Sequence, residues 1–222
     1  MFLRLDSKPE VEQPPLAEAI YFVDDDRIEV AGLLQTFENL GFNCIYFNSP
    51  ERFLSEVPKN ACGCLVIDQH MPRISGLEVF DEVVRRSLNL TTVLLSGNCD
   101  LPECRAAFHK GMFDVVEKSY ERDIIEDAIH RAVAQNRKER CKTIAVESHW
   151  QRIRALTERE LEVAQLLADG KTLKEVGKGL SISAQTASKH RSSIFTKLGV
   201  NNEVELHKSI DLCSQLIDQL NR

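Results

Sequence analysis

Apolar residues in the first 140 positions of the chain follow two alternating patterns. Short apolar runs, rich in β-branched and aromatic residues, predict strands, and segments whose apolar residues recur every three or four positions predict helices. The predicted strands are residues 19–23, 42–47, 64–68, 91–96 and 113–118. The predicted helices are residues 28–40, 50–57, 77–88, 101–109 and 123–140. This alternation predicts an α/β fold with a doubly wound, five-stranded parallel sheet.

Only the helical pattern occurs after residue 153. Thr157 and Glu160 form a predicted capping box at the start of an amphipathic helix that ends near Gly170. Its inward residues are predicted to be Leu161, Ala164, Leu167 and Ala168. Helices at 173–180 and 184–198, joined by a turn, predict an all-α helix-turn-helix domain. A final apolar stripe comprises Val204, Leu206, Ile210, Cys213, Leu216, Ile217 and Leu220.

Charge is distributed unevenly between these two parts. Residues 1–150 contain 17 Lys and Arg against 25 Asp and Glu, a balance of −8, whereas residues 151–222 contain 11 against 9, a balance of +2. Within the second part, residues 171–197 carry six basic side chains and a single acidic one. An acidic part joined to one with a basic segment indicates two domains with different partners. A small helical bundle with a solvated basic face is the simpler interpretation of the second part.

The cysteines and the apolar runs indicate the cellular compartment of the protein. The chain has seven cysteines, an odd number with scattered spacing, which is typical of a reduced, cytoplasmic protein. Cys62 and Cys64 lead into an apolar strand and have no second Cys or His pair at ligand spacing, so we interpret them as buried thiols. No apolar run is long enough to span a membrane, and the N-terminus lacks a signal-peptide pattern, so we expect no membrane partner.

Polar residues at the ends of four predicted strands carry the candidate chemistry. Asp24 and Asp25 follow the first strand, Asp68 ends the third, Ser96 the fourth and Lys118 the fifth. In a doubly wound sheet these ends meet at one edge, where ligands bind. Converging carboxylates repel one another without a cation, and an oxygen-only ligand set favours Mg²⁺. Asp68 is then placed as a nucleophile toward a phosphoryl donor, with Lys118 as a second positive charge and Ser96 as a hydroxyl donor.

Asp26 has a different interpretation from its two neighbours. Asp is a favoured N-cap residue, so we expect Asp26 to cap the helix that follows the first strand.

The motifs "VDDD", "VIDQHMPRISGLEV", "VLLSG" and "VEKS" occur in that order at the strand ends. Together they resemble a response-regulator receiver domain, a flavodoxin-like fold, over residues 18–133. The resemblance implies that Asp68 is the phosphoacceptor and that a sensor histidine kinase is the donor. It implies a Mg²⁺ site formed by Asp24, Asp25, Asp68 and the backbone carbonyl of His70. Ser96 and Lys118 match the hydroxyl and lysine of the family.

Two positions depart from the receiver pattern. Ser119 stands where receivers usually have proline after the lysine, and Val115 stands where an aromatic residue usually swings inward. The usual aromatic switch is therefore absent from this chain.

The basic segment resembles a second family. "LTERELEV", Gly170, "KEV", "LSIS", Thr186, His190 and "KLGV" resemble the LuxR-type (NarL/FixJ-like) helix-turn-helix over residues 154–206. The resemblance implies double-stranded DNA as a partner, with base-reading residues Ser188, Lys189 and Ser192. The residues that it implies for phosphate contacts are Thr172, Lys174, Thr186, His190, Arg191 and Lys197. Part of the final apolar stripe is expected to form a homodimer, which would match a two-fold operator.

These observations predict a tail (1–17), a receiver domain (18–133), a helical linker (134–152) and a LuxR-type DNA-binding domain (153–222). We interpret the chain as a phosphorylation-controlled transcriptional regulator of a two-component system, and not as a metabolic enzyme. One alternative is a DNA-binding regulator with an atypical receiver controlled by protein partners. Another is a Mg²⁺-dependent phosphatase with Asp68 as nucleophile, which would lack a general acid because Gln69 and His70 follow.

Overall fold

A computed structural model of the chain describes residues 17–97, 101–119 and 121–220, without the side chains of residues 103 and 214–220. The predicted tail therefore lies almost wholly outside the described residues. The described chain forms two compact units, one up to Cys141 and one from Lys142 onward. The predicted domain boundaries near residues 133 and 153 stay predictions.

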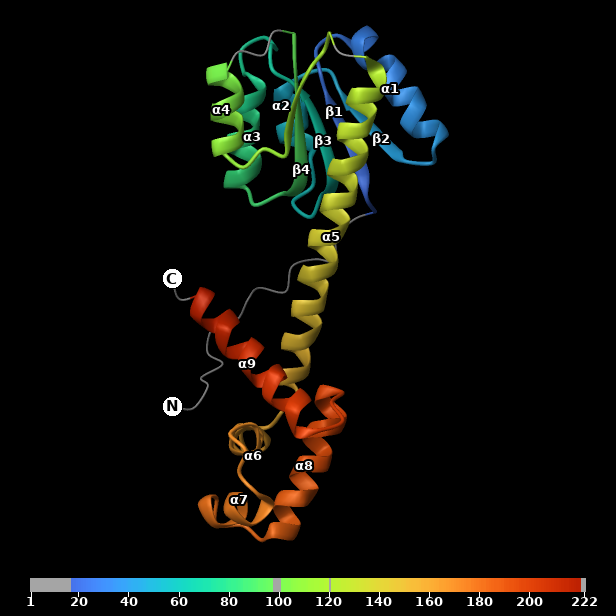
Figure 1. The fold of residues 1–222 in the computed structure, drawn as a ribbon. Helices are drawn as coiled ribbons and strands as arrows, with labels where there is room; N and C mark the ends of the chain where they lie inside the picture. The colour runs from blue at the N-terminus through green and yellow to red at the C-terminus, as the bar shows by residue number, and fades with distance from the viewer. Residues whose placement is uncertain (1–16, 98–100, 120, 221–222) are drawn as a thin grey trace. The chain divides into compact units, whose positions relative to one another are not determined.

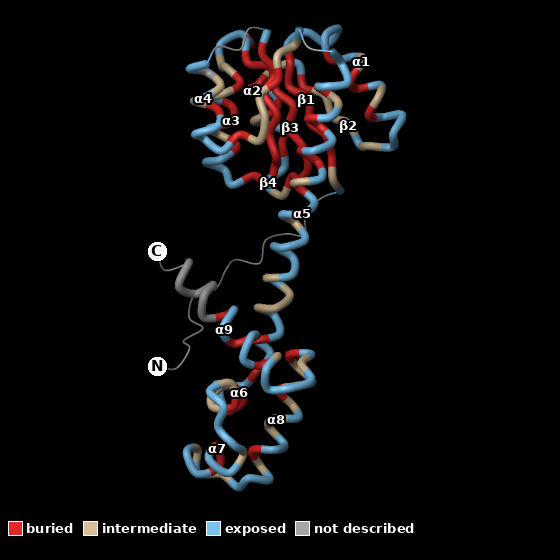
Figure 2. Tube along the Cα trace, in the orientation of Figure 1, coloured by how far each residue is buried: buried red, intermediate tan, exposed pale blue. Residues whose placement is uncertain are grey.

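The first unit contains a parallel sheet of five strands within the described residues, in the order β2-β1-β3-β4-β5 (Figure 1). The strands are β1 (Ala19–Val23), β2 (Asn43–Phe47), β3 (Cys62–Asp68), β4 (Asn89–Ser96) and β5 (Asp114–Glu117). Every residue of β3 is buried, because the strand is central and covered on both faces (Figure 2). The predicted doubly wound sheet is confirmed.

Helices cover both faces of this sheet. They are α1 (Arg27–Asn39), α2 (Pro50–Glu56), α3 (Gly76–Arg85), α4 (Leu101–His109) and α5 (Arg122–Arg154). One hydrophobic cluster joins α1 and α5 to the sheet, with Phe37 and Ile129 fully buried. A second cluster joins the helices of the other face, with Phe53 and Val79 fully buried. The two clusters are separate cores on the two faces of one sheet.

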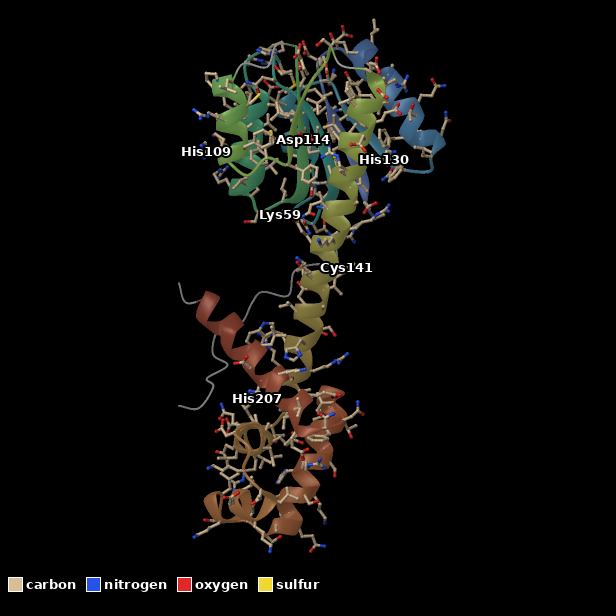
Figure 3. The ribbon with its side chains drawn as sticks, viewed as in Figure 1. Lys59, His109, Asp114, His130, Cys141 and His207 are labelled. Carbon is tan, nitrogen blue, oxygen red and sulfur yellow. The ribbon has the colours of Figure 1, made fainter. Side chains whose placement is uncertain are left out.

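Helix α5 continues without a break past residue 140, where the predicted periodic helix ends and the predicted helical linker follows, to Arg154. Its first half is attached to the sheet unit by specific contacts. His130 packs on the rings of Phe37 and Phe42, and Arg131 pairs with Asp114 at 2.8 Å (Figure 3). The fully buried Asn136 accepts a hydrogen bond from the backbone N–H of Gly63 and donates to the carbonyl of Asn89. The amide thus satisfies backbone groups at the N-terminal ends of β3 and β4.

The second unit is helical, with α6 (Glu158–Ala168), α7 (Leu173–Gly179), α8 (Ala184–Leu198) and α9 (Glu203–Leu220). Its core includes the fully buried Ile153 from the last turn of α5, with Trp150 packed against it. The predicted capping box of Thr157 and Glu160 opens α6. The predicted all-α helix-turn-helix domain is therefore observed.

The predicted apolar stripe of α9 packs in part on its own unit. Leu206, Ile210 and Cys213 are buried in the core, but Val204 is 64% exposed. Val204 lies in the first turn of α9, beyond the part of the stripe that is buried in the described core. The side chains of Leu216, Ile217 and Leu220 lie outside the described residues.

Candidate functional site

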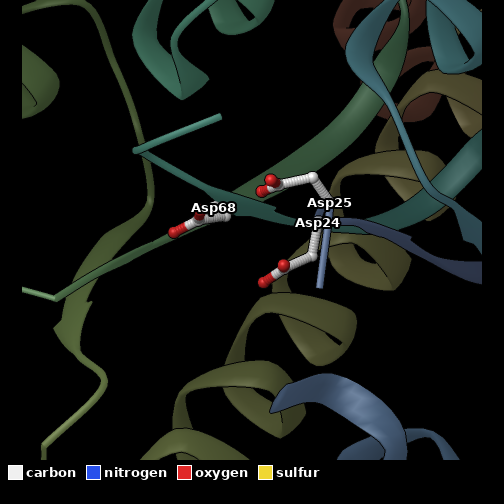
Figure 4. Close-up of side chains that lie close together, drawn as sticks. All are labelled: Asp24, Asp25 and Asp68. Carbon is white, nitrogen blue, oxygen red and sulfur yellow. The ribbon is translucent and has the colours of Figure 1, made fainter. Parts of the chain in front are cut away.

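Three aspartates meet at the carboxyl edge of the sheet. Asp24 directly follows β1, Asp25 is the next residue, and Asp68 ends β3, which pairs with β1 (Figure 4). One carboxylate oxygen of each lies within 4.8 Å of the others. Asp24 and Asp68 are buried and Asp25 is exposed. The parallel register of the two strands thus produces the carboxylate cluster that the sequence predicts.

The local backbone fixes these carboxylates in place. Asp24 accepts a hydrogen bond from the backbone N–H of Asp26 at 2.8 Å, and Asp26 in turn caps α1 by accepting from Ile28. The predicted capping role of Asp26 is confirmed. On β3, the chain turns into α3 so tightly that a Cβ added at Gly76 would lie 2.6 Å from the carbonyl oxygen of Asp68. Only glycine fits this approach, which keeps Asp68 at the mouth of the site.

Lys118 supplies the positive charge of the cluster. It follows β5, and its backbone N–H donates to the carbonyl of Ser96 at 2.8 Å. Its Nζ donates to Asp24 at 3.0 Å and lies 2.9 Å from an oxygen of Asp68. It also forms an ion pair with Glu29 of α1. Ser96 is fully buried at the end of β4, in the same row of strand ends.

The electrostatics follow from burial and these contacts. Burial raises the pKa of the Asp24 carboxyl, although hydrogen bonds from the Asp26 N–H and Lys118 oppose the rise. Burial alone would lower the pKa of Lys118, but hydrogen bonds to Glu29, Asp68 and Asp24 outweigh it and raise that pKa. Lys118 is therefore held as a cation. A cluster of this kind favours binding of an additional positive charge.

A cleft of about 420 Å³ gives access to these groups. Its lining residues are Asp24, Asp25, Asp26, Glu29, Asp68, His70, Gly97 and Lys118. His70 is exposed and lines the cleft, and the role of its carbonyl as a ligand stays a prediction. Two buried carboxylates, one exposed carboxylate and an ammonium group in one open cleft can hold a hard cation beside a phosphoryl group.

Sequence reasoning missed two residues at this site. Glu29 follows the predicted N-cap of α1 and looks like a favourable first-turn charge, so nothing in the pattern assigned it to Lys118. The hydroxyl of Tyr46 on β2 donates to the backbone carbonyl of Asp24 at 2.8 Å. Tyr46 reaches this carbonyl because β2 pairs with β1. A prediction of the strand order would have placed Tyr46 beside the site.

The two departures from the receiver pattern take ordinary conformations. Val115 on β5 is half-buried and packs against the hydrophobic cluster that contains Phe53 and Val79. The bond between Lys118 and Ser119 is trans, and the Ser119 hydroxyl donates to Glu117 at 2.5 Å.

The helix-turn-helix presents the predicted base-reading residues on one face. Ser188, Lys189 and Ser192 of α8 are exposed, whereas Ala187 and Ile194 on the other side of the helix are buried in the core. The approach of α7 to the turn is close, since a Cβ added at Gly177 would lie 2.8 Å from the carbonyl oxygen of Ile182. The exposed face of α8 is therefore held by a tightly packed turn.

The predicted phosphate-contacting residues fall into two groups. Thr172 caps α7, Lys174 is exposed, and Thr186 and His190 are half-buried on α8. By contrast, Arg191 and Lys197 already have acidic partners. Arg191 pairs with Glu203 at 2.7 Å and stacks on the ring of Phe195. Lys197 pairs at 2.6 Å with the buried Glu160.

Both units match known families. Residues 20–130 match the family model of the response regulator receiver domain, and residues 154–209 match that of the bacterial regulatory proteins of the luxR family. The chain belongs to the two-component response regulators that combine a receiver domain with a LuxR-type DNA-binding domain. The predicted class, a phosphorylation-controlled DNA-binding transcriptional regulator, is confirmed, and the alternative with an atypical receiver is not favoured.

Individual relatives extend over most of the chain. The transcriptional regulatory protein TdiR of Thauera aromatica is 30% identical over 190 residues, which cover 86% of this chain and 84% of TdiR. The transcriptional regulatory protein FixJ of Bradyrhizobium diazoefficiens is 27% identical over 187 residues, which cover 84% of this chain and 91% of FixJ. The solved structure of the response regulator StyR has a TM-score of 0.81 and 28% identity, and the match covers 88% of this chain and 99% of that one. In the described residues, no helix is long and apolar enough to cross a membrane.

Proposed function

We propose that Asp68 accepts a phosphoryl group from a sensor histidine kinase. The observation that carries this proposal is the position of Asp68, which ends the central strand between the Asp24–Asp25 pair and Lys118. Its carboxylate lines an open cleft, so a donor can reach it. In the transfer, an oxygen of Asp68 forms a bond to phosphorus while the bond from phosphorus to the donor's histidine nitrogen breaks. The electron pair leaves with that nitrogen, which then takes up a proton.

Asp24, Asp25 and Asp68 would hold Mg²⁺, with the backbone carbonyl of His70 as a further ligand. The residues fit this ion, since they offer only oxygen ligands, and three carboxylate oxygens lie within 4.8 Å of one another. When bound, Mg²⁺ supplies positive charge to the phosphoryl oxygens. Lys118 would donate to the phosphoryl group from its ammonium group, and Ser96 would donate from its hydroxyl. The kinase partner and the DNA target make the cytoplasm the expected compartment.

Intact mass of the full-length protein tests the acceptor. We expect incubation with Mg²⁺ and a small acyl phosphate to add about 80 Da, the mass of one phosphoryl group. Asp68→Asn should lose this addition, whereas Asp81→Asn, an exposed aspartate on α3, should keep it. A full-yield adduct on Asp68→Asn would move the acceptor to another residue.

We propose further that α8 binds the major groove of DNA, with Ser188, Lys189 and Ser192 facing the bases. Thr172, Lys174, Thr186, His190, Arg191 and Lys197 would contact phosphates, and the active form would be a homodimer on a two-fold operator. The exposed face of α8 supports this proposal. Lys189→Ala should relax base preference by about 1–3 kcal/mol at one position, and Lys174→Ala should weaken all sequences alike. If Lys174→Ala changed base preference and Lys189→Ala weakened all sequences alike, Lys174 would be the base-reading residue and Lys189 the phosphate contact.

A further inference from the structure

Glu29 is the least expected partner of Lys118. The ammonium group of Lys118 has three N–H donors, and three carboxylates surround it, those of Glu29, Asp24 and Asp68. The side chains of Asp24 and Asp68 are 2% and 6% exposed, whereas that of Glu29 is 51% exposed. Glu29 therefore binds the solvent side of an ammonium group whose other donors are directed into the site.

The ion pair of Glu29 and Lys118 also lies at the boundary of two cavities. Both residues line the acidic cleft, and both line a second cavity of about 310 Å³. The other lining residues of the second cavity are apolar: Val30, Leu33, Leu95 and Ile125. Among the described residues that line either cavity, Glu29 is the one carboxylate that touches both.

We propose that Glu29 is a positioning residue for the phosphorylation site, which holds Lys118 in place and, by its charge, limits the stability of the phosphorylated state. This inference rests on the proposed phosphorylation of Asp68. Once Asp68 carries a phosphoryl group, the single negative charge of its carboxylate is replaced by the two charges of the phosphoryl group, and the donor of Lys118 that Asp68 held turns to the phosphoryl oxygens. Glu29 keeps its own donor and its full charge, so it repels the phosphoryl dianion across one ammonium group.

Glu29→Gln separates the charge from the contact. The amide oxygen of Gln can still accept from Lys118, so the positioning persists while the negative charge is lost. We expect full-length Glu29→Gln to bind beryllofluoride, an anionic phosphoryl mimic, about three- to tenfold more tightly than the parent in the presence of Mg²⁺ at low salt. The gain should shrink as salt is raised, a dependence that a merely structural role would not produce. Glu38→Gln, which removes an exposed charge at the far end of α1, is the matched control and should bind like the parent.

The ¹⁵N signal of the Lys118 ammonium group provides a second readout. It should move in Glu29→Ala, which loses both contact and charge, much more than in Glu29→Gln. If Glu29→Gln binds beryllofluoride like the parent at low salt, or Glu38→Gln shows the same gain, the inference is overturned. If Asp68→Asn binds beryllofluoride as well as the parent does, the proposed function fails instead. The two failures are thus distinguishable.

Discussion

The pair formed by Glu160 and Lys197 predicts a loss of folding stability that can be measured in one unit of the protein. Glu160 of α6 is buried and accepts hydrogen bonds from the backbone and hydroxyl of Thr157, from Ser193 at 2.6 Å and from Lys197 at 2.6 Å. Burial would raise the pKa of Glu160, but these donors, with Lys197 first, lower it to about 2. Lys197→Met removes the one cation and leaves a buried carboxylate with its neutral donors.

The size of the effect lies between two limits. Breaking a fully buried ion pair costs about 3–5 kcal/mol, whereas exposed pairs contribute up to about 1 kcal/mol. Glu160 is 7% exposed but Lys197 is 33% exposed, so water can partly replace the ammonium group. We expect Lys197→Met to lower the free energy of unfolding by about 2 kcal/mol at pH 7.

The chain offers a local probe for this measurement. Trp150 is the single tryptophan and packs against the core of the second unit, so its fluorescence during urea unfolding of the full-length protein reports on that unit. Lys189→Met, on the exposed face of the same helix, is the control and should stay within about 0.5 kcal/mol of the parent.

The stability difference between Lys197→Met and the parent should also depend on pH. The pKa of Glu160 is lower in the folded than in the unfolded chain, so its stabilisation is complete above about pH 4.5 and is lost as the pH falls toward 2. The difference between Lys197→Met and the parent should therefore shrink below about pH 4.5. Equal stability of both proteins at pH 7, or a loss that does not change with pH, would refute the reasoning.

Three further predictions use the same protein. Gly177→Ala should destabilise the second unit by about 1–3 kcal/mol because its Cβ would meet the Ile182 carbonyl. Gly179→Ala should instead stabilise this unit by up to about 1 kcal/mol in the same urea assay, because the nearest atom to its added Cβ is 4.0 Å away. Asp25→Ala should weaken Mg²⁺ binding strongly in a titration while leaving thermal stability equal or higher, since repulsion among the carboxylates falls; unchanged Mg²⁺ affinity would contradict its role. Phosphorylation should raise DNA affinity by about 1 kcal/mol or less, because Val115 has one dominant rotamer and little area to move; a hundredfold gain measured at constant salt would show that a full switch operates without an aromatic residue there.

Most of the fold and the carboxylate cluster could be predicted because they depend on patterns that are local in the sequence. Strand ends are visible as polar residues after apolar runs, and a parallel sheet brings those ends to one edge whatever the exact strand order. Asp24, Asp68 and Lys118 are consequently found from the sequence. The sequence also predicts a helical linker over residues 134–152, but not the exact end of α5 at Arg154, where the buried Ile153 belongs to the core of the other unit.

Glu29 and Glu160 show why the remaining features are invisible in the sequence. Each is a glutamate in the first turn of a helix, a position that local rules explain completely by the helix dipole and the capping box. In the folded chain each also receives a lysine from a distant element, Lys118 for Glu29 and Lys197 for Glu160. The exposed fraction then decides the consequence. Glu160, at 7%, is part of the structure of its unit, whereas Glu29, at 51%, lines an open cleft beside the proposed phosphorylation site. Two residues with the same local sequence role therefore have different tertiary surroundings, and local sequence rules cannot distinguish them.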